Sequence, residues 1–459
     1  MAVNIDSTCD FQNLWLPFTQ MAEPITGFTP KIVRGEGCWL IDDHGKRYLD
    51  AIASWWVNIH GHDEKRLIDE IKKQADVLPH CSMGSMVHEP GLKLARMLAR
   101  IAPTGLERVF YSDDGSTAVE AAIKISYQFF HQNGQAQRKY FVAMKGAYHG
   151  DTLGGVSLGD IGSYHSRFRD LCFPALRADA PDCATCDEGE NLLDLPGGPE
   201  PTCSLKCLGP LEDLLDEHGT ECCGLVTEPL VQGANGMRMY KSAALKRMRE
   251  LCDNHGMHLI LDCVAVAFGR TGRMFAAEHA GISPDLMAVA KGLTGGYMPL
   301  AATLATREIF EGFLGKYEED RKLAHGHSFT GNPLAAACGV RNLELFEEDH
   351  IFETLPAKVN LLHELWASMN DLDHTAGVRA MGMIAALDLE KDPARHVSYE
   401  PEEKAGKQVA AECLEQGVFV RPLGDTMYIL PPLAIKPDEI ELAVTTMRKA
   451  IKKITGQEG

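Results

Sequence analysis

The stretch LMAVAKG, residues 286–292, decides the fold, because an apolar run typical of a buried strand ends there on Lys291 and a glycine. An earlier apolar run, HLILD at 258–262, ends in the same way on Asp262. A lysine and an acid at two strand ends suit pyridoxal phosphate (PLP). The amine forms a Schiff base with the aldehyde, and the carboxylate keeps the pyridine nitrogen protonated. Taken alone, the pair is better explained as two ordinary strand ends with charged residues facing water.

The middle of the chain alternates short apolar runs with helix-like segments. We expect buried strands at residues 109–111, 140–142, 224–226, 259–261, 287–289 and 301–304. Helical patterns separate most of them, as at residues 118–130 and 243–252. The alternation predicts an α/β fold with a largely parallel central sheet and helices on both faces. Ligands bind such sheets at the carboxyl ends of the strands, where Asp262 and Lys291 stand.

The chain of 459 residues is too long for one ordinary compact core, so we expect two domains. We predict that residues 1–60 contribute to a small domain and to the active site, and that residues 61–334 form a large cofactor-binding domain. Residues 335–459 are predicted to be a smaller α+β domain, whose last helix opens at Pro437. Residues 179–209, rich in Pro, Gly, Asp, Glu and Cys, look like an insertion or a long surface loop.

The amino-acid composition limits the classes of partner that the protein is expected to bind. The net charge of −19 argues against nucleic acid or an anionic membrane as a main partner. We find no signal peptide and no apolar stretch near the roughly 18 residues that a membrane helix needs. A cytoplasmic protein is therefore expected, and its cysteines are not expected to form a disulfide framework.

Five loops follow strands or open helices in one order around the Asp262–Lys291 pair. They are SDDGSTAVE (112–120), GAYHGDT (146–152), EPLVQGANGM (228–237), FGRTG (268–272) and SFTGNP (328–333). The first offers backbone amides, a helix dipole and the Ser116 hydroxyl to a phosphate, although a plain helix cap is the commoner reading. In the second, Tyr148 can stack on a flat ring or simply belong to an aromatic loop. Each loop is weak alone, but five in this order are not a coincidence.

The set resembles the class-III aminotransferases, fold-type I PLP enzymes, over nearly the whole chain. The resemblance implies that Lys291 carries the internal aldimine and moves the proton, while Asp262 pairs with the pyridinium nitrogen. It also implies that Gly115 and Ser116 hold the phosphate and that Tyr148 stacks on the ring. Ser328 matches a residue that reaches the phosphate of the neighbouring subunit, which implies an obligate homodimer with shared active sites.

Several segments are similar to one branch of that family. They are LWLPFTQM (14–21), SWW (54–56), IHG (59–61), QGANGMRMY (232–240), Ala265, GVFVRP (417–422) and YILPP (428–432). This branch converts 8-amino-7-oxononanoate to 7,8-diaminononanoate in biotin biosynthesis. Its usual amino donor is S-adenosylmethionine, and a minority of members use lysine. The resemblance therefore implies this reaction, with another ω-amino acid or ketone acceptor as the alternative.

Substrate-binding residues follow from the acceptor, a long apolar chain with a terminal carboxylate. Trp55 and Trp56 can wall an apolar slot, and Arg421 can pair with the carboxylate. The alternative is a pair of core tryptophans and a surface arginine. In a strand, adjacent tryptophans cannot both face one core, so one is left for another task. The resemblance adds Tyr148 or Asp151 as contacts of the donor, and the remaining predicted substrate residues are Lys291, Gly326 and Tyr428.

The sequence departs from the family pattern beside Asp262 and at the phosphate loop. The usual Glu, Thr and Gly are replaced by Cys263, Val266 and Ala267, and Asp114 takes the first position of a common Ser-Gly-Ser turn. Lys291 and Asp262, the minimum for the chemistry, are intact. The substitutions therefore put rate and substrate choice in question more than reaction type.

Two close cysteine pairs have the spacing of metal ligands. CATC at 183–186 and CSLKC at 203–207 supply Cys183, Cys186, Cys203 and Cys207. Thiolates in a reducing compartment suit structural zinc or, less well, an iron–sulfur cluster. The alternative is four cysteines without a metal in an irregular loop. A non-catalytic, metal-bearing relative is the third functional hypothesis.

Overall fold

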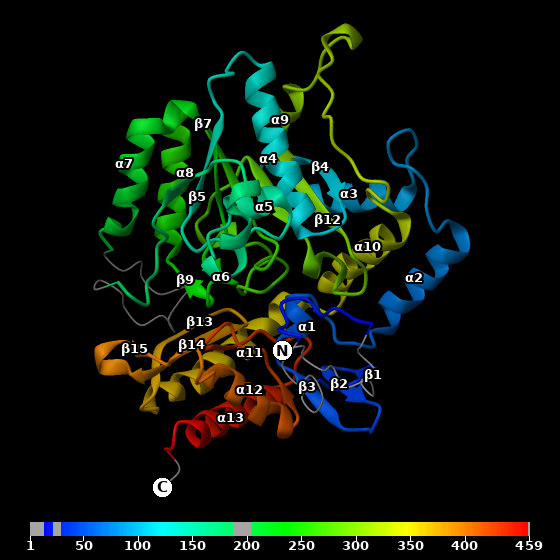
Figure 1. Cartoon of the computed structure of the whole chain (residues 1–459). Coiled ribbons are helices and arrows are strands. Elements are labelled where there is room, and N and C mark those ends of the chain that lie inside the picture. The colour runs from blue at the N-terminus through cyan, green and yellow to red at the C-terminus, as the bar shows by residue number, and fades with distance from the viewer. Residues whose placement is uncertain (1–12, 22–28, 187–202, 458–459) are drawn as a thin grey trace.

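The computed structural model describes residues 13–21, 29–186 and 203–457. Its centre is a seven-stranded sheet in the order β4-β12-β11-β10-β7-β5-β6. The strands are β4 (Leu106–Ser112), β12 (Ala301–Thr306), β11 (Leu286–Val289), β10 (His258–Asp262), β7 (Cys222–Thr227), β5 (Tyr140–Met144) and β6 (Leu176–Ala178). β12 runs antiparallel to both its neighbours, and the other pairs are parallel. The predicted α/β class and all six predicted strands are confirmed, and β6 is additional (Figure 1).

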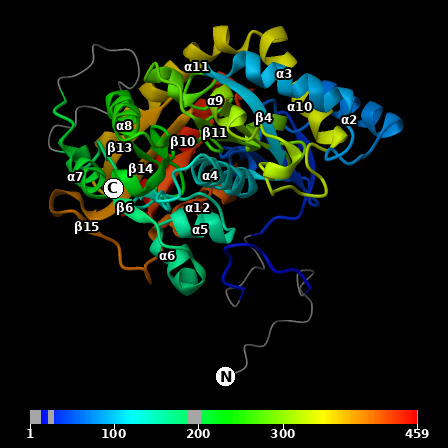
Figure 2. The ribbon, with the colours of Figure 1, turned by 90° about the horizontal axis from the view of Figure 1, so that it is seen from above.

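Both faces of this sheet are buried, because successive side chains along each strand enter different cores. On β10, Ile260 packs with α4 (Gly115–Gln132) on one face, whereas Leu259 and Leu261 join the core that contains α8 (Ser242–His255). Both predicted central helices are therefore confirmed. Helices α7 (Gly209–His218) and α8 lie at one side of the molecule, and α2 (Lys65–Val77), α3 (Glu89–Ile101) and α10 (Pro333–Glu348) lie at the other (Figure 2).

The two ends of the chain combine below the central sheet (Figure 1). β1 (Ile32–Glu36), β2 (Trp39–Asp42) and β3 (Arg47–Asp50) form a sheet with β16 (Val418–Phe419), which pairs in parallel with β3. A second sheet contains β13 (Thr375–Met381), β14 (Ile384–Asp392), β15 (Val397–Ser398) and β17 (Thr426–Ile429). Helices α11 (Ile351–Ala367), α12 (Ala405–Glu415) and α13 (Pro437–Ile454) accompany them, and α13 opens at Pro437 as predicted. The domain boundaries at residues 60 and 334 stay predictions.

The other helices and the two short strands β8 and β9 lie between these strands along the chain. They are α1 (Ala53–Trp56), α2 (Lys65–Val77), α3 (Glu89–Ile101), α5 (Leu153–Leu158), α6 (Gly162–His165), α7 (Gly209–His218), α9 (Arg307–Glu311), α10 (Pro333–Glu348), β8 (Val231–Gln232) and β9 (Arg238–Met239). Within the described ranges, every helix is too short or too polar to cross a lipid bilayer.

Candidate active site

A cavity of about 390 Å³ lies at the carboxyl ends of the parallel strands, where open α/β sheets bind ligands. Six of the predicted site residues line it: Trp56, Gly115, Ser116, Tyr148, Asp262 and Lys291. The other six, Trp55, Asp151, Gly326, Ser328, Arg421 and Tyr428, are not part of its lining. Strand ends from β4, β5, β7, β10 and β11 thus converge on one space.

Lys291 follows the end of β11 and opens a short 3₁₀ turn, Lys291–Thr294. Its backbone φ is +48°, a strained conformation for a residue with a side chain. Its Nζ lies 4.5 Å from the centre of the Trp56 ring. Burial lowers the pKa of the amine to about 8, although the nearby Asp262 and Glu228 carboxylates act in the opposite direction. A larger fraction of the amine is therefore neutral than in an ordinary lysine.

Asp262, at the end of β10, is held by two hydrogen bonds. His149 Nδ1 donates to Oδ2 at 2.8 Å, and the Val264 backbone N–H donates to Oδ1 at 3.1 Å. Burial acts to lower the pKa of His149, but the hydrogen bond and charge of Asp262 outweigh it, so the pKa is raised. The carboxylate is thus fixed in direction and its negative charge is supported by a neighbouring imidazole.

Glu228 and His149 are buried polar residues of the site that sequence reasoning did not select. Glu228 Oε1 accepts from the Tyr148 N–H at 3.0 Å, and Oε2 accepts from the Gly233 N–H at 2.8 Å. Burial raises the pKa of Glu228 to about 7, with His149 acting against the rise. The signal that could have found Glu228 is its position directly after an apolar strand, which is the same signal that identified Asp262.

The start of α4 lines the cavity with Gly115 and Ser116. The Asp114 carboxylate accepts from the Thr117 N–H, and Thr117 Oγ1 accepts from the Asp114 N–H, both at 2.9 Å. The acid that departs from the family pattern is therefore engaged in capping the helix. A Cβ at Gly115 would lie only 2.6 Å from Val264 Cγ1, so this turn requires glycine. Ser116 Oγ accepts from the Asp151 N–H at 3.3 Å.

Tyr148 lines the cavity from the loop after β5. Its hydroxyl donates to Asp151 Oδ2 at 2.7 Å, and its ring lies nearly parallel to His165 with centroids 5.9 Å apart. Burial raises the pKa of the Tyr148 phenol. Asp151 itself is exposed, so it is connected to the cavity through Tyr148.

The two adjacent tryptophans do not lie in a strand, and that part of the sequence reasoning is wrong. Residues 53–56 form a left-handed turn with φ of +49°, +48°, +77° and +73°. Trp56 Nε1 donates to Tyr428 Oη at 3.1 Å. The Arg421 guanidinium lies 4.1 Å from the centre of the Trp55 ring. The turn thus sends Trp56 toward Lys291 and Trp55 toward Arg421.

Gly326 and Ser328 lie on an exposed loop and do not line the cavity of their own chain. Between them, His327 Nδ1 stands 3.5 Å from Asp113 Oδ2, which places this loop beside the β4–α4 turn. A role for Ser328 in a neighbouring subunit stays a prediction.

The predicted metal site at Cys183, Cys186, Cys203 and Cys207 is not formed. All four residues are described, and among the described residues no group of three or more His, Cys, Asp or Glu side chains could hold a metal ion. Cys183 instead packs against the large core, and its N–H donates to Met239 O at 3.0 Å. Burial raises the pKa of its thiol to about 11, and the nearby Cys207 and Cys203 add to the rise. Residues 187–202 of the predicted insertion lie outside the described residues.

Comparison with known proteins agrees with the geometry. The Aminotransferase class-III model matches residues 21–451. An adenosylmethionine-8-amino-7-oxononanoate aminotransferase from Geobacter sulfurreducens is 46% identical over 447 residues, covering 97% of each chain. The crystal structure of the enzyme of that name from Methanocaldococcus jannaschii superposes with a TM-score of 0.90 at 36% identity, covering 96% of this chain and 97% of that one. An omega transaminase from Pseudomonas jessenii in complex with PMP has a TM-score of 0.89 at 28% identity, covering 98% and 99%. The chain therefore belongs to the class-III aminotransferase family and is a PLP-dependent transaminase.

Proposed function

We propose that this enzyme transfers an amino group from S-adenosylmethionine to 8-amino-7-oxononanoate, giving 7,8-diaminononanoate for biotin biosynthesis. The observation that carries the proposal is the 46% identity, over nearly both whole chains, with a relative named for this reaction. Two further relatives of the same name are 45% and 40% identical over 97% of the chain. The cavity chemistry is consistent with this acceptor.

The residues of the cavity fit PLP. The amide groups at the start of α4, with Gly115 and Ser116, would hold the phosphate, and Asp262 would face the pyridine nitrogen. His149 Nε2 is buried and has no hydrogen-bond partner within the described chain, as expected beside a space made for a ligand. Bound through Lys291, PLP supplies an electron-accepting ring that stabilises negative charge on the carbon next to the transferred nitrogen.

Lys291 is proposed to hold the cofactor and to move the proton during transfer. An amine with a pKa near 8 is sufficiently neutral around physiological pH to act as a nucleophile and a base. The Trp56 ring, 4.5 Å from Nζ, covers the amine and limits the access of water. Tyr148 is proposed to lie against the cofactor ring, where its backbone is fixed by Glu228.

Arg421 is proposed to bind the terminal carboxylate of the acceptor. Its guanidinium packs 4.1 Å from the Trp55 ring, which orients the charge without neutralising it. Trp56, which lines the cavity and is held by its hydrogen bond to Tyr428, is proposed to offer apolar ring surface to the carbon chain. On the donor, Tyr148 or Asp151 is proposed as the contact, since the two side chains are hydrogen-bonded to each other.

We also infer an obligate homodimer with shared active sites. The loop that carries Gly326 and Ser328 exposes Phe329 at 60%, and Tyr317 before it is exposed at 97%. Large exposed apolar side chains beside a site-forming loop support a subunit interface there. Light scattering on the purified protein tests this, and a monomer with full activity would contradict it.

The runner-up is another acceptor, an ω-amino acid or a different ketone, or lysine as donor. Cys263, Val266 and Ala267 are all buried next to Asp262, and Val266 lines the cavity. These residues differ from the family pattern at the place where the cofactor and substrate would meet. These three substitutions are the observation that supports another acceptor or donor.

A donor screen tests the proposal. Purified protein with PLP is given 8-amino-7-oxononanoate with S-adenosylmethionine and lysine in parallel, and Lys291→Ala serves as control. We expect product with S-adenosylmethionine and none with the variant, which also loses the cofactor absorbance band. Product only from lysine changes the donor. Failure to rescue a biotin auxotroph, with turnover of other amines, favours the runner-up, and no turnover of any pair favours the non-catalytic hypothesis.

A further inference from the structure

Asn342, on α10, is fully buried and faces the turn that follows Lys291. Its Nδ2 group donates to Gly292 O and to Leu293 O, both at 3.0 Å. Its Oδ1 accepts from His60 Nε2 at 2.9 Å. The amide thus joins the Lys291 turn to the segment that precedes α2.

Within the turn after Lys291, Gly292 O also accepts from the Gly295 N–H at 3.0 Å, so the Asn342 amide is a second donor to Gly292 O and a donor to Leu293 O. Lys291, Gly295 and Gly296 have φ of +48°, +62° and +87°, so the chain reverses sharply within six residues. Carbonyls in a buried turn that lack partners are costly. A Cβ on Gly296 would lie 2.9 Å from the Val57 carbonyl carbon, and the Ile59 N–H donates to Gly295 O at 3.2 Å. The turn is therefore clamped between residues 57–60 and α10.

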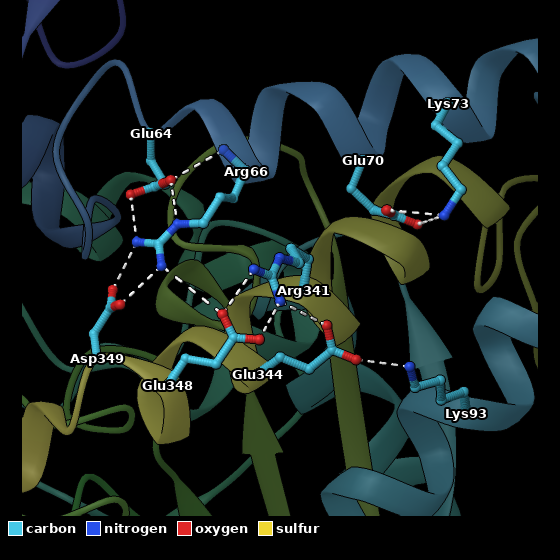
Figure 3. Close-up of polar contacts among 9 residues, drawn as sticks. All are labelled: Glu64, Arg66, Glu70, Lys73, Lys93, Arg341, Glu344, Glu348 and Asp349. Atoms are coloured by element: carbon cyan, nitrogen blue, oxygen red, sulfur yellow. Dashed lines mark hydrogen bonds and ion pairs between the residues drawn. The ribbon is translucent and has the colours of Figure 1, made fainter.

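The opposite, outer face of α10 is fixed by ion pairs (Figure 3). Arg341 pairs with Glu344 at 3.0 Å and with Glu348 at 2.7 Å on the same helix. Lys93 of α3 reaches Glu344 at 2.7 Å, and Arg66 of α2 reaches Asp349, the residue that ends α10, at 2.7 Å. Exposed pairs contribute little singly, about 0–1 kcal/mol, but a network across three helices fixes the rotation of α10 and hence the direction of Asn342.

We propose that Asn342 is a positioning residue for Lys291. By holding two consecutive carbonyls of the Lys291–Thr294 turn, it fixes the backbone from which the amine projects. The inference rests on the proposed function, in which this amine holds the cofactor and moves a proton. In this proposal, α10 and His60 contribute to catalysis by positioning Lys291, and neither contacts the substrate.

The test compares Asn342→Leu, which removes all three hydrogen bonds at similar volume, with Asn342→Asp, which keeps an acceptor for His60 but loses the donors. Val340→Ala is the matched control, because Val340 is also buried on α10 and its side chain has no polar atom to donate to the turn. In cofactor-free protein we measure the pH dependence of Lys291 labelling and the hydrogen exchange of residues 292–296. In the loaded enzyme we measure kcat and KM separately.

For both Asn342 variants we expect faster exchange in the turn, a Lys291 labelling pKa that moves toward the ordinary lysine value, and a kcat lower by about 10–100-fold with little change in KM. Val340→Ala is expected to keep wild-type exchange, labelling and kcat. Folded Asn342 variants with wild-type exchange, labelling and kcat overturn the inference. If Asn342→Leu does not fold, Asn342→Asp decides. If wild-type protein neither binds PLP nor turns over, the proposed function fails, while the exchange and labelling of the cofactor-free protein still decide the role of Asn342.

Discussion

The active-site cavity and the cysteine-rich segment both carry residues that the sequence suggests as ligands, yet among the described residues only the cavity arranges them as a site. Asp262 is placed by β10, which pairs with β11 so that Asp262 stands opposite Ala288, three residues before Lys291. The hydrogen bonds of the sheet therefore set the distance between the two groups. In the segment around Cys183 no strand pairing aligns one cysteine pair with the other, and the thiol packs into the core instead. The sequence separation of ligand residues predicts a site only when strands or helices bring their side chains close together.

The largest expected effect is at Asp262. Replacing it by Asn keeps the volume but removes the charge that raises the pKa of His149 and that is proposed to face the cofactor nitrogen. We expect kcat to fall by at least about 100-fold. Steady-state kinetics with circular dichroism on the folded variant measure this.

The matched control is Asp285→Asn, at the opposite end of the same strand pair. Asp285 Oδ2 accepts from the Leu259 N–H at 2.7 Å and from Arg249 Nη1 at 2.6 Å, so it is a structural acid. Its loss is expected to lower stability and leave kcat nearly unchanged. Equal losses of kcat in both variants would show that the effect of removing an acid does not depend on which end of the strand pair the acid occupies.

The next effect concerns the Lys291 amine in cofactor-free enzyme. We expect a labelling pKa of about 8 rather than 10.5, and a further decrease in Glu228→Gln, because the Glu228 charge raises the lysine pKa. Since the unfolded chain binds the proton more tightly, this group makes stability rise with pH between about 8 and 10.5. Labelling of Lys291, measured by mass spectrometry across pH 6–11, checks the predicted pKa. A labelling pKa equal to that of an ordinary lysine would show that the amine is not desolvated.

A smaller effect is expected at Tyr428, which is hydrogen-bonded to Trp56 of the cavity wall. Tyr428→Phe removes the oxygen that accepts from Trp56 Nε1, leaving a buried donor without a partner. We expect the free energy of unfolding to fall by about 1–3 kcal/mol. Urea denaturation measures it against the wild-type protein. A Tyr428→Phe variant as stable as the wild type would mean that water replaces the hydroxyl.

The same contrast explains how much could be predicted from the sequence. The strands, α4, α8, the start of α13 and the meeting of Lys291 with Asp262 depend on local periodicity and on one general rule for parallel sheets, so they were predictable. The short edge strand β6 was missed because Leu176–Ala178 has no apolar run. The left-handed turn at residues 53–56 and the role of Asn342 arise from contacts with chain far away in sequence, such as Trp56 with Tyr428, and no local pattern encodes them.

The smallest effects are expected in the cysteine-rich segment. Because burial raises the pKa of the Cys183 thiol to about 11, its alkylation is expected to be slow at neutral pH and to quicken as the pH approaches that value. A Cys183→Ala, Cys207→Ala double variant is expected to keep wild-type kcat and metal content, as measured by elemental analysis of protein purified without chelator. One zinc ion per wild-type chain, lost in the double variant, would reverse this conclusion. It would mean that the four thiolates come together only when a bound metal compensates for their desolvation. The metal ion would then position the cysteines, as strand pairing positions Asp262 and Lys291.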